Sequence, residues 1–429
     1  MVDRLLYPPV RRILILNTFP SGGGAAMMAS QTLEGLRALG CDARMLVAAP
    51  LPPGSPDHIR SIGGLKWTFL RYLEKGGTLL ALRGNRHNLF RFSTASTGLS
   101  EVLSHPWIEW ADTINIHWVQ QSFLSIRQLQ RLLSLPGKKF IWTLHDLWPL
   151  TGGCHSPYSV APDGSTSLCE RYLTGCGSCP ILDKLRTPNS ELRTSKSELS
   201  ARLFAEKLKW PLQGVTFQAV SRMTEEVLKG SPIGALGKTV ILPNFFDPAL
   251  FYVKENCPKE KQILFAATRP DDPVKGLDLA KEALRKAVSQ NPSFAEYTFT
   301  IVGKPKSDDL LRDFPVPLKV IPEATRTGLA DLYRSSALTL SASRSETFGL
   351  TLLESIACGT PVVSFDLPGP ATFVRHGENG LLAPPFDTDA LAGSLLRLCF
   401  PSAPFEVKAV AATADAYRRD AVLRQFLLL

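Results

Sequence analysis

Short apolar runs alternate with segments of helical periodicity along most of the chain. The first run, Ile13 to Leu16, has no polar interruption, which is typical of a strand buried on both faces of a parallel sheet. Apolar residues at helical spacing follow it and end near Gly40, a residue type that often terminates helices. The stretch "SGGG" therefore falls between a predicted strand and a predicted helix.

Two further predicted strands, 112–117 and 138–145, each end in a histidine, His117 and His145. In an open parallel sheet ligands bind beyond the carboxyl ends of the strands, so both histidines lie at the edge where chemistry is expected. For His145, which precedes Asp146, we favour a functional role over that of a core histidine. For His117, which precedes Trp118, we favour packing or capping of the strand.

A second alternating series begins near residue 215, and 429 residues are enough for two ordinary hydrophobic cores. The pattern predicts an α/β fold with two doubly wound, Rossmann-like domains that face a central cleft. We place an N-terminal domain over residues 1–210, with a polar, cysteine-bearing insertion over 151–200. A C-terminal domain is predicted over 211–400 and a helical tail over 401–429.

The charge composition favours negatively charged binding partners but does not distinguish between them. With 48 Lys and Arg against 39 Asp and Glu, the formal net charge is +9, which suits an anionic ligand, an acidic membrane surface or nucleic acid. The sequence contains no run of about 18 apolar residues, the length of a membrane span, and its first residues lack the features of a signal peptide. We therefore expect a cytoplasmic protein.

The segment "SETFGLTLLESIACGTPVVS" carries two carboxylates, Glu346 in a predicted loop and Glu354 in the helix that follows. Eight helical residues span about 12 Å, too far for two carboxylates that share a proton. Between them, the N–H groups of the first helical turn form an anion site. A ligand with a central diphosphate and hydroxylated groups at both ends fits this layout; the alternative is that both glutamates are solvated surface charges.

Two cations precede this segment in "AATRPDDPVKGLDLAKEAL". Arg269 lies just past a predicted strand and Lys275 just before a predicted helix, so both are expected at the same cleft. Cations near a helix N-terminus stabilise the charge that grows on a leaving diphosphate. Ordinary solvation of a loop is the alternative on this segment alone.

The run from Ser343, "SRSETFGLTLLESIACGTPVVSFDLPG", together with "GENGLL", resembles the signature of the retaining glycosyltransferases of family 4, which have the GT-B fold. The stretches "SGGGAAMMAS", "ADTINIHWV" and "TLHDLWPLTGGCHS" further resemble the subgroup that acts in colanic acid and other exopolysaccharide assembly. The resemblance extends from about Ile13 to Leu396.

The resemblance implies a role for each matching position. Glu346 matches the glutamate that contacts the donor sugar, and Glu354 matches the one that holds the nucleotide ribose. Arg269 and Lys275 match the pair that neutralises the diphosphate, and His145 matches a histidine near the reaction centre. Donor and substrate binding is further implied for the two glycine-containing loops: Gly22, Gly23, Gly24, Thr347, Phe348, Gly349 and Leu350.

The implied reaction is retaining transfer of a sugar from a UDP-, GDP- or ADP-sugar to a glycan or lipid-linked glycan, with no cofactor required for catalysis. Same-face substitution, in which the leaving phosphate helps to deprotonate the acceptor, is the expected mechanism. The alternatives are a nucleotide-sugar epimerase or phosphorylase on the same fold, or a zinc-bearing basic protein that binds nucleic acid. No nucleic-acid motif is evident, and we expect no such partner.

Two segments suggest further properties. Within the insertion, four cysteines have a C-x14-C-x6-C-x2-C spacing that predicts either a structural zinc site or free thiols and disulfides: Cys154, Cys169, Cys176 and Cys179. The stretch 65–92 mixes aromatic and basic residues, and it predicts either peripheral contact with an anionic membrane at the inner face of the cell membrane or a helix with solvated charges.

Overall fold

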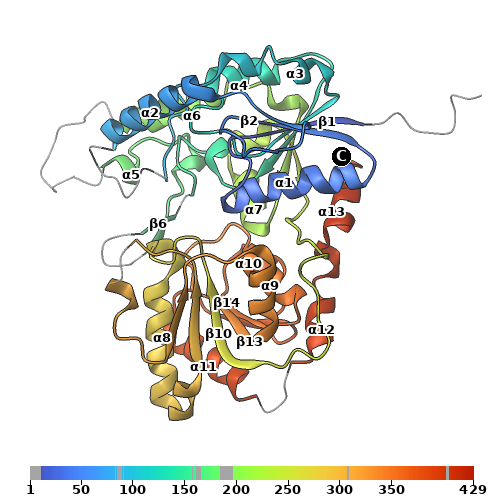
Figure 1. Ribbon diagram of the computed structural model, residues 1–429. Helices are drawn as coiled ribbons and strands as arrows, with labels where there is room; N and C mark the ends of the chain where they lie inside the picture. Colours follow the sequence, from blue (N-terminus) through green and yellow to red (C-terminus); the bar gives the residue numbers. More distant parts are fainter. Residues whose placement is uncertain are drawn as a thin grey trace, which may run out of the picture.

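The computed structural model describes residues 11–429 except 83, 85–88, 90, 157, 161–165, 184–196, 307–308 and 402–404. It contains two parallel β-sheets, each covered by helices, and the two domains are stacked one above the other in Figure 1. The predicted α/β class with two Rossmann-like domains is confirmed.

The N-terminal domain is built on a seven-stranded sheet with the order β3-β2-β1-β4-β5-β8-β9. Its first strand pairs in parallel with both β2 and β4, so Ile15 lies between Met45 and Asn115. The strands are β1 (Arg12–Asn17), β2 (Asp42–Val47), β3 (Ile59–Ser61), β4 (Thr113–Ile116), β5 (Lys139–Leu144), β8 (Val215–Ala219) and β9 (Lys238–Ile241). The helices are α1 (Gly23–Ala38), α2 (Gly64–Ala81), α3 (Pro106–Trp110), α4 (Ile126–Leu133), α5 (Pro180–Asp183), α6 (Ser197–Lys207) and α7 (Arg222–Gly230).

The C-terminal domain has a six-stranded sheet with the order β12-β11-β10-β13-β14-β15. Its strands are β10 (Glu260–Ala266), β11 (Thr298–Val302), β12 (Leu318–Ile321), β13 (Ser336–Ser341), β14 (Val362–Phe365) and β15 (Gly380–Ala383). Its helices are α8 (Leu277–Gln290), α9 (Arg326–Ser335), α10 (Leu350–Ala357) and α11 (Thr388–Cys399). A small hairpin, β6 (Tyr158–Val160) with β7 (Thr166–Leu168), lies in the insertion.

The predicted boundary at residue 210 is wrong. Strand β8 pairs with β5, and β9 pairs with β8, so both belong to the N-terminal sheet. The chain passes to the second sheet between Ile241 and Glu260. The error has a simple cause: a buried strand such as "VTFQA" has the same apolar pattern whichever parallel sheet it joins.

The tail predicted over 401–429 forms helices α12 (Val407–Ala412) and α13 (Arg419–Phe426). Figure 1 shows α13 returning to the N-terminal domain beside α1. There Leu423 and Phe426 join the buried cluster that includes Met28 of α1. Contact is so close at Gly35 that a Cβ atom there would lie 2.3 Å from Leu423 Cδ1. The last helix therefore ties the end of the chain to the first domain.

Candidate active site

At the strand ends of the C-terminal sheet, two residues that were predicted separately as site residues, Lys275 and Glu346, lie together. Lys275 lies in the turn before α8, and Glu346 lies in the loop between β13 and α10. Lys275 Nζ is 2.8 Å from Glu346 Oε2, and this carboxylate raises the pKa of the lysine. Two of the predicted site residues are therefore in direct contact, and their catalytic roles stay a prediction.

Glycines shape the two turns that hold this pair. Gly276 has φ 67°, and a Cβ atom there would lie only 1.9 Å from the carbonyl oxygen of Ala342. Gly349, with φ 101°, is the N-cap of α10 and allows the chain to enter the helix from the Glu346 loop. Both positions need a left-handed backbone, which glycine adopts without strain. Leu352 N already donates to Gly349 O, so the N–H groups of Leu350 and Thr351 are the ones that helix geometry leaves able to bind an anion at the start of α10.

Glu354 is inside the protein, so it is not the solvated charge of the alternative interpretation. It is 4% exposed, and its carboxylate lies 3.6 Å from Arg326 and 3.4 Å from the Tyr333 hydroxyl. Burial raises the pKa of Glu354 to about 7, and Arg326 and the Tyr333 hydroxyl offset only part of that effect. A buried carboxylate with this pKa retains capacity to accept hydrogen bonds from a ligand.

Arg269 lies beyond β10, as predicted, but its guanidinium is engaged elsewhere. It makes two 2.9 Å hydrogen bonds to the carboxylate of Asp271, two residues along the same loop. The structure therefore places Arg269 and Lys275 in one loop and pairs them with different carboxylates.

The glycine loop of the first domain faces the start of α10. Gly22 and Gly23 have positive φ angles, and α1 begins at Gly23. A Cβ atom on Gly24 would lie 4.0 Å from Leu350 Cδ1, the first residue of α10. Residues 21–24 are exposed, and the close approach of their backbone to a ligand stays a prediction.

His145 and His117 are joined at the edge of the N-terminal sheet, where His145 Nε2 is 2.8 Å from His117 Nδ1. The amide of Asn115 donates to Ile141 O and Thr143 Oγ1, so its Oδ1 accepts from His117 Nε2 at 2.8 Å. This order makes His145 Nε2 the donor to His117, and it leaves Nδ1 of His145 as an acceptor. Burial lowers the pKa of His145 to about 4 and lowers that of His117 well below its usual value, so both rings are neutral.

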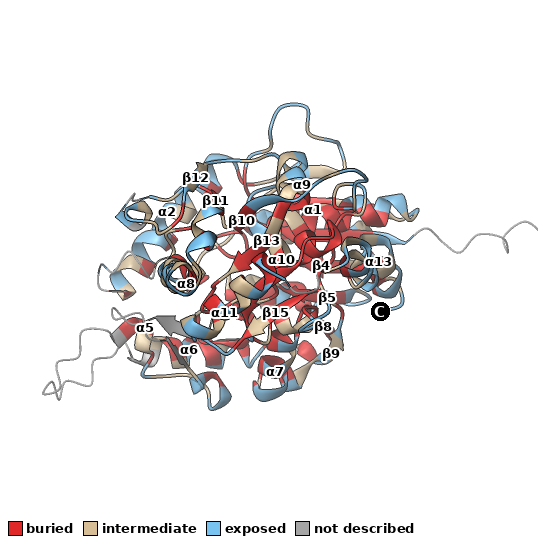
Figure 2. Ribbon diagram, turned by 90° about the horizontal axis from the view of Figure 1, so that it is seen from below, coloured by how far each residue is buried: buried red, intermediate tan, exposed pale blue. Residues whose placement is uncertain are grey.

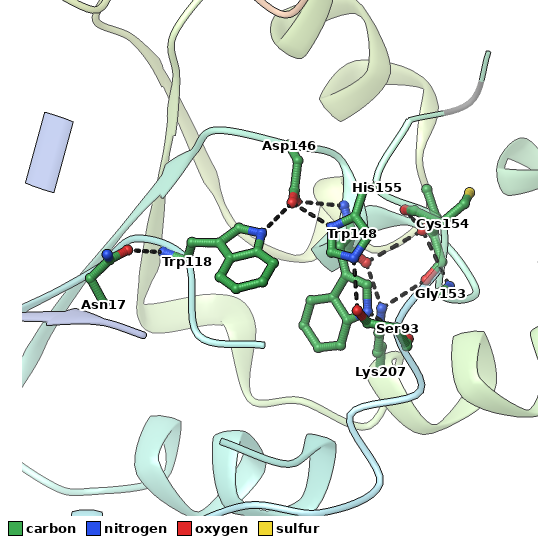
Figure 3. A network of polar contacts seen from close by, with 10 residues as sticks. Asn17, Ser93, Trp118, Asp146, Trp148, Gly153, Cys154, His155 and Lys207 are labelled. Carbon is green, nitrogen blue, oxygen red and sulfur yellow. Dashed lines mark hydrogen bonds and ion pairs between the residues drawn. The ribbon is translucent and has the colours of Figure 1, made fainter. Parts of the chain in front are cut away.

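A second polar network lies beside His145, and Figure 3 shows it from close by. His155 Nδ1 is 2.6 Å from Asp146 Oδ2, and His155 Nε2 is 2.8 Å from Ser93 Oγ. The indole of Trp118 donates to the same carboxylate at 2.7 Å. Burial raises the pKa of Asp146, but the charge interaction with His155 and then hydrogen bonds from His155, Trp148 N and Trp118 outweigh it, so the pKa is lowered and the carboxylate is ionised.

Our sequence reasoning did not identify Ser93 or His155. Their loops reach the second domain: Ser156 Oγ is 3.4 Å from Ser345 Oγ, and Arg91 is 3.3 Å from the carboxylate of Asp272. The available signal was the position of His155 ten residues after His145 in a motif that begins at a strand end.

The cysteine-bearing insertion is held by a buried lysine. Lys207 Nζ donates to the carbonyl groups of Trp148 and Thr151 and lies 3.5 Å from the centre of the Trp148 ring. Burial lowers the pKa of Lys207 to about 7. Figure 3 shows this contact next to Cys154.

The cysteines of the predicted zinc site lie near one another, because burial and then the charges of Cys179, Cys176 and Cys169 raise the pKa of the Cys154 thiol. All eight cysteines are free thiols in the structure, and burial raises the pKa of Cys176 to about 11. Within the described ranges, no group of three or more His, Cys, Asp or Glu side chains is arranged to hold a metal ion. The structural zinc site therefore stays a prediction.

Comparison with known sequences identifies relatives of part of the chain. Residues 260–399, about a third of the chain, match the family model described as glycosyl transferases group 1. A D-inositol 3-phosphate glycosyltransferase from Acidothermus cellulolyticus is 38% identical over 141 residues, which is 30% of this chain and 32% of the relative. A second, from Rhodococcus erythropolis, is 34% identical over 159 residues, 34% of this chain and 35% of the relative. The match spans about a third of the length of these curated relatives.

Comparison with solved structures covers nearly the whole chain. Sucrose-phosphate synthase from Thermosynechococcus elongatus aligns with a TM-score of 0.63 and 19% identity, covering 97% of this chain and 98% of that one. The pneumococcal O-GlcNAc transferase GtfA, solved with UDP and GlcNAc, aligns with a TM-score of 0.59 and 15% identity, covering 98% of each chain. At these identities the likeness shows the fold, and the expected GT-B architecture is confirmed.

Proposed function

We propose that this protein is a glycosyltransferase that moves a sugar from a nucleotide-sugar donor to a hydroxylated acceptor with retention of configuration. The observation that carries the proposal is the placement of two unlike carboxylates around the start of α10. Glu346 is paired with Lys275 in the loop before the helix, whereas Glu354 is buried within the helix. The family match over residues 260–399 contains both carboxylates and supports this assignment.

The donor diphosphate would lie on the N-terminus of α10. Its charge would be neutralised by Lys275 and by Arg269, once the guanidinium exchanges Asp271 for phosphate. Bidentate guanidinium contacts and fixed N–H dipoles stabilise the charge that develops as a diphosphate leaves. Glu354 would accept hydrogen bonds from the ribose hydroxyls, and Glu346 and His145 would hold the sugar.

In the proposed reaction, an acceptor hydroxyl oxygen bonds to the anomeric carbon while the bond to the diphosphate oxygen breaks. The diphosphate leaves with the electron pair, and the acceptor proton passes to its oxygen on the same face. His145 supplies a neutral acceptor at Nδ1 for a sugar hydroxyl, because Asn115 and His117 fix its other nitrogen as a donor. Holding the acceptor hydroxyl and the leaving diphosphate on the same face of the sugar is the main contribution of the protein.

The acceptor would enter beside Ser93, His155 and Asp146. We propose that this acceptor is a glycan or a lipid-linked glycan used in surface polysaccharide synthesis. Ser93 Oγ is hydrogen-bonded to His155 Nε2, and a hydroxyl has the capacity for a further hydrogen bond with an acceptor hydroxyl. The curated relatives are named for an inositol phosphate acceptor, but the family match lies in the C-terminal domain, which we assign to the donor. We therefore do not transfer their acceptor to this chain.

A thermal-shift screen against UDP, GDP, ADP and their sugars tests the donor assignment, with UDP and its sugars first because one structural neighbour was solved with UDP. One nucleotide class should raise the Tm, and Glu354→Ala should abolish that response. Glu378→Ala, which removes an exposed carboxylate paired with Arg375, is the matched control and should keep it. Tight RNA binding without any nucleotide response would refute the proposal. Released nucleoside diphosphate in the presence of a lipid-linked oligosaccharide then reports transfer.

A further inference from the structure

Helix α2 buries polar Glu74 and Thr78 together with Trp67, whereas most of its large apolar side chains are exposed to solvent, unlike those of an ordinary surface helix. On the inner face, the buried carboxylate of Glu74 accepts hydrogen bonds from Ala95 N at 2.8 Å and Ser122 Oγ at 2.7 Å. The indole of Trp67 donates to Gln121 O at 2.8 Å. Directed contacts therefore fix the rotation of α2 about its own axis.

The outer face of α2 carries large apolar side chains that are between 51% and 91% exposed. At about 100° per residue they fall within an arc of about 100° and form one stripe along the helix. We call this stripe the α2 face: Leu65, Phe69, Tyr72, Leu73 and Leu80. Figure 1 places α2 at the outer edge of the N-terminal domain, and Figure 2 shows exposed segments along it. The other exposed large apolar side chains in the described part of the chain are spread over separate elements.

Basic residues border the α2 face on both sides. By the same rotation, Lys66 and Lys75 lie on opposite edges of the stripe, and both are exposed. Glu74 is the one acidic residue of α2, and it is buried. Lys66 also pairs with Glu101, whereas Arg71 lies 5.1 Å from the centre of the Trp67 ring. An apolar face with cationic edges is the pattern of a helix that lies in the interface of an anionic membrane.

We propose that the α2 face docks this protein onto an anionic lipid surface. The apolar stripe would enter the boundary between headgroups and acyl chains, and Lys66 and Lys75 would contact lipid phosphates. Docking would bring the domain that we assign to the acceptor up to a lipid-linked substrate; only this consequence rests on the proposed function. A second copy of the chain fits the face less well, because two such stripes packed together would place lysines of both copies along the same seam.

Flotation of the full chain with lipid vesicles tests the proposal. The protein should float with vesicles of phosphatidylcholine mixed with phosphatidylglycerol, and much less with phosphatidylcholine alone. The triple variant Leu65→Ser, Phe69→Ser and Leu80→Ser should lose binding at least tenfold, and Lys75→Glu should lose about tenfold in low salt. Leu428→Ser, which removes an equally exposed leucine elsewhere, is the matched control. Because all these side chains are exposed, the Tm should change little.

Two results would overturn the proposal. One is equal flotation of the triple variant and the native protein. The other is a native dimer, seen by sedimentation without lipid, that the triple variant dissolves; the face would then bind a second copy. Failure of the proposed function looks different: Glu354→Ala should lose the nucleotide response and still float, whereas the triple variant should keep the response and not float.

Discussion

The buried carboxylate of Glu354 should make binding of the proposed nucleotide-sugar donor depend on pH. Burial raises its pKa from the usual 4.5 to about 7. If ribose hydroxyls donate to this carboxylate, the donor binds the ionised form and releases a proton wherever Glu354 is still protonated. At pH 6 only about one molecule in ten is ionised, so affinity should be about tenfold lower than at pH 8. Binding should therefore strengthen as pH rises through 7.

Calorimetric titration of the native protein measures this linkage. A nucleotide sugar is the proper probe, because its two phosphate groups are diesters of the diphosphate and do not titrate near neutrality. At pH 6.5, titrations in two buffers with different ionisation enthalpies should show net proton release on binding. Glu354→Gln should bind more weakly, without proton release, whereas Glu346→Gln should retain it. Equal proton release by Glu354→Gln, or pH-independent affinity of the native protein, would refute the reasoning.

The same substitution affects stability in the opposite direction. A carboxyl group whose pKa is higher in the folded than in the unfolded state lowers stability as pH rises from about 4.5 to about 7. The shift corresponds to up to about 3 kcal/mol at pH 8. Glu354→Gln should therefore raise the free energy of unfolding at pH 8 while it weakens donor binding. Denaturant titrations at pH 5 and pH 8 measure the difference, which should nearly vanish at pH 5.

Three further predictions concern other parts of the site. His145 has a pKa of about 4 and is neutral near pH 7, so kcat at saturating donor should not fall between pH 8 and pH 6. A fall in kcat near pH 6.5 that disappears in His145→Gln would contradict this. Gly276→Ala should lower the free energy of unfolding by about 2 kcal/mol or more, because φ is 67° and the new Cβ meets Ala342 O, whereas Gly393→Ala in open space on α11 should raise it by about 0.5 kcal/mol. His155→Ala should raise KM for the acceptor about tenfold with an unchanged KM for the donor, and equal changes in both would contradict an acceptor role.

Local patterns predicted the elements and the chemistry at their ends. The strand ends place His117, His145 and Arg269 in the loops that the apolar runs indicated, and Lys275 meets Glu346 although 71 residues separate them. Such predictions succeed because parallel strands place all their carboxyl ends at one edge. Position along a strand is therefore enough to say which side chains share that edge.

The sequence pattern could not predict which of several similar strands or carboxylates a given strand or side chain would pair with. Strand β8 fits either parallel sheet by its pattern, and only the crossover through the insertion decides that it joins β5. Arg269 pairs with Asp271, a carboxylate two residues along the same loop. The sequence pattern did not indicate which carboxylate the guanidinium would bind. His155 reaches Asp146 through the fold of the insertion, which has little periodicity to interpret.

Glu346 and Glu354 lie in different environments, and only the charge of Glu354 has a clear cost to the stability of the fold. Glu346 is compensated by a lysine at 2.8 Å, so its charge costs the folded state little. Glu354 is buried with an arginine no closer than 3.6 Å, and its raised pKa is a net cost to folding that an apolar residue at this position would avoid. A structural role does not explain a carboxylate that destabilises its own fold. Its place eight residues from Glu346 on the helix that begins at the anion site is explained if a ligand completes its hydrogen bonds.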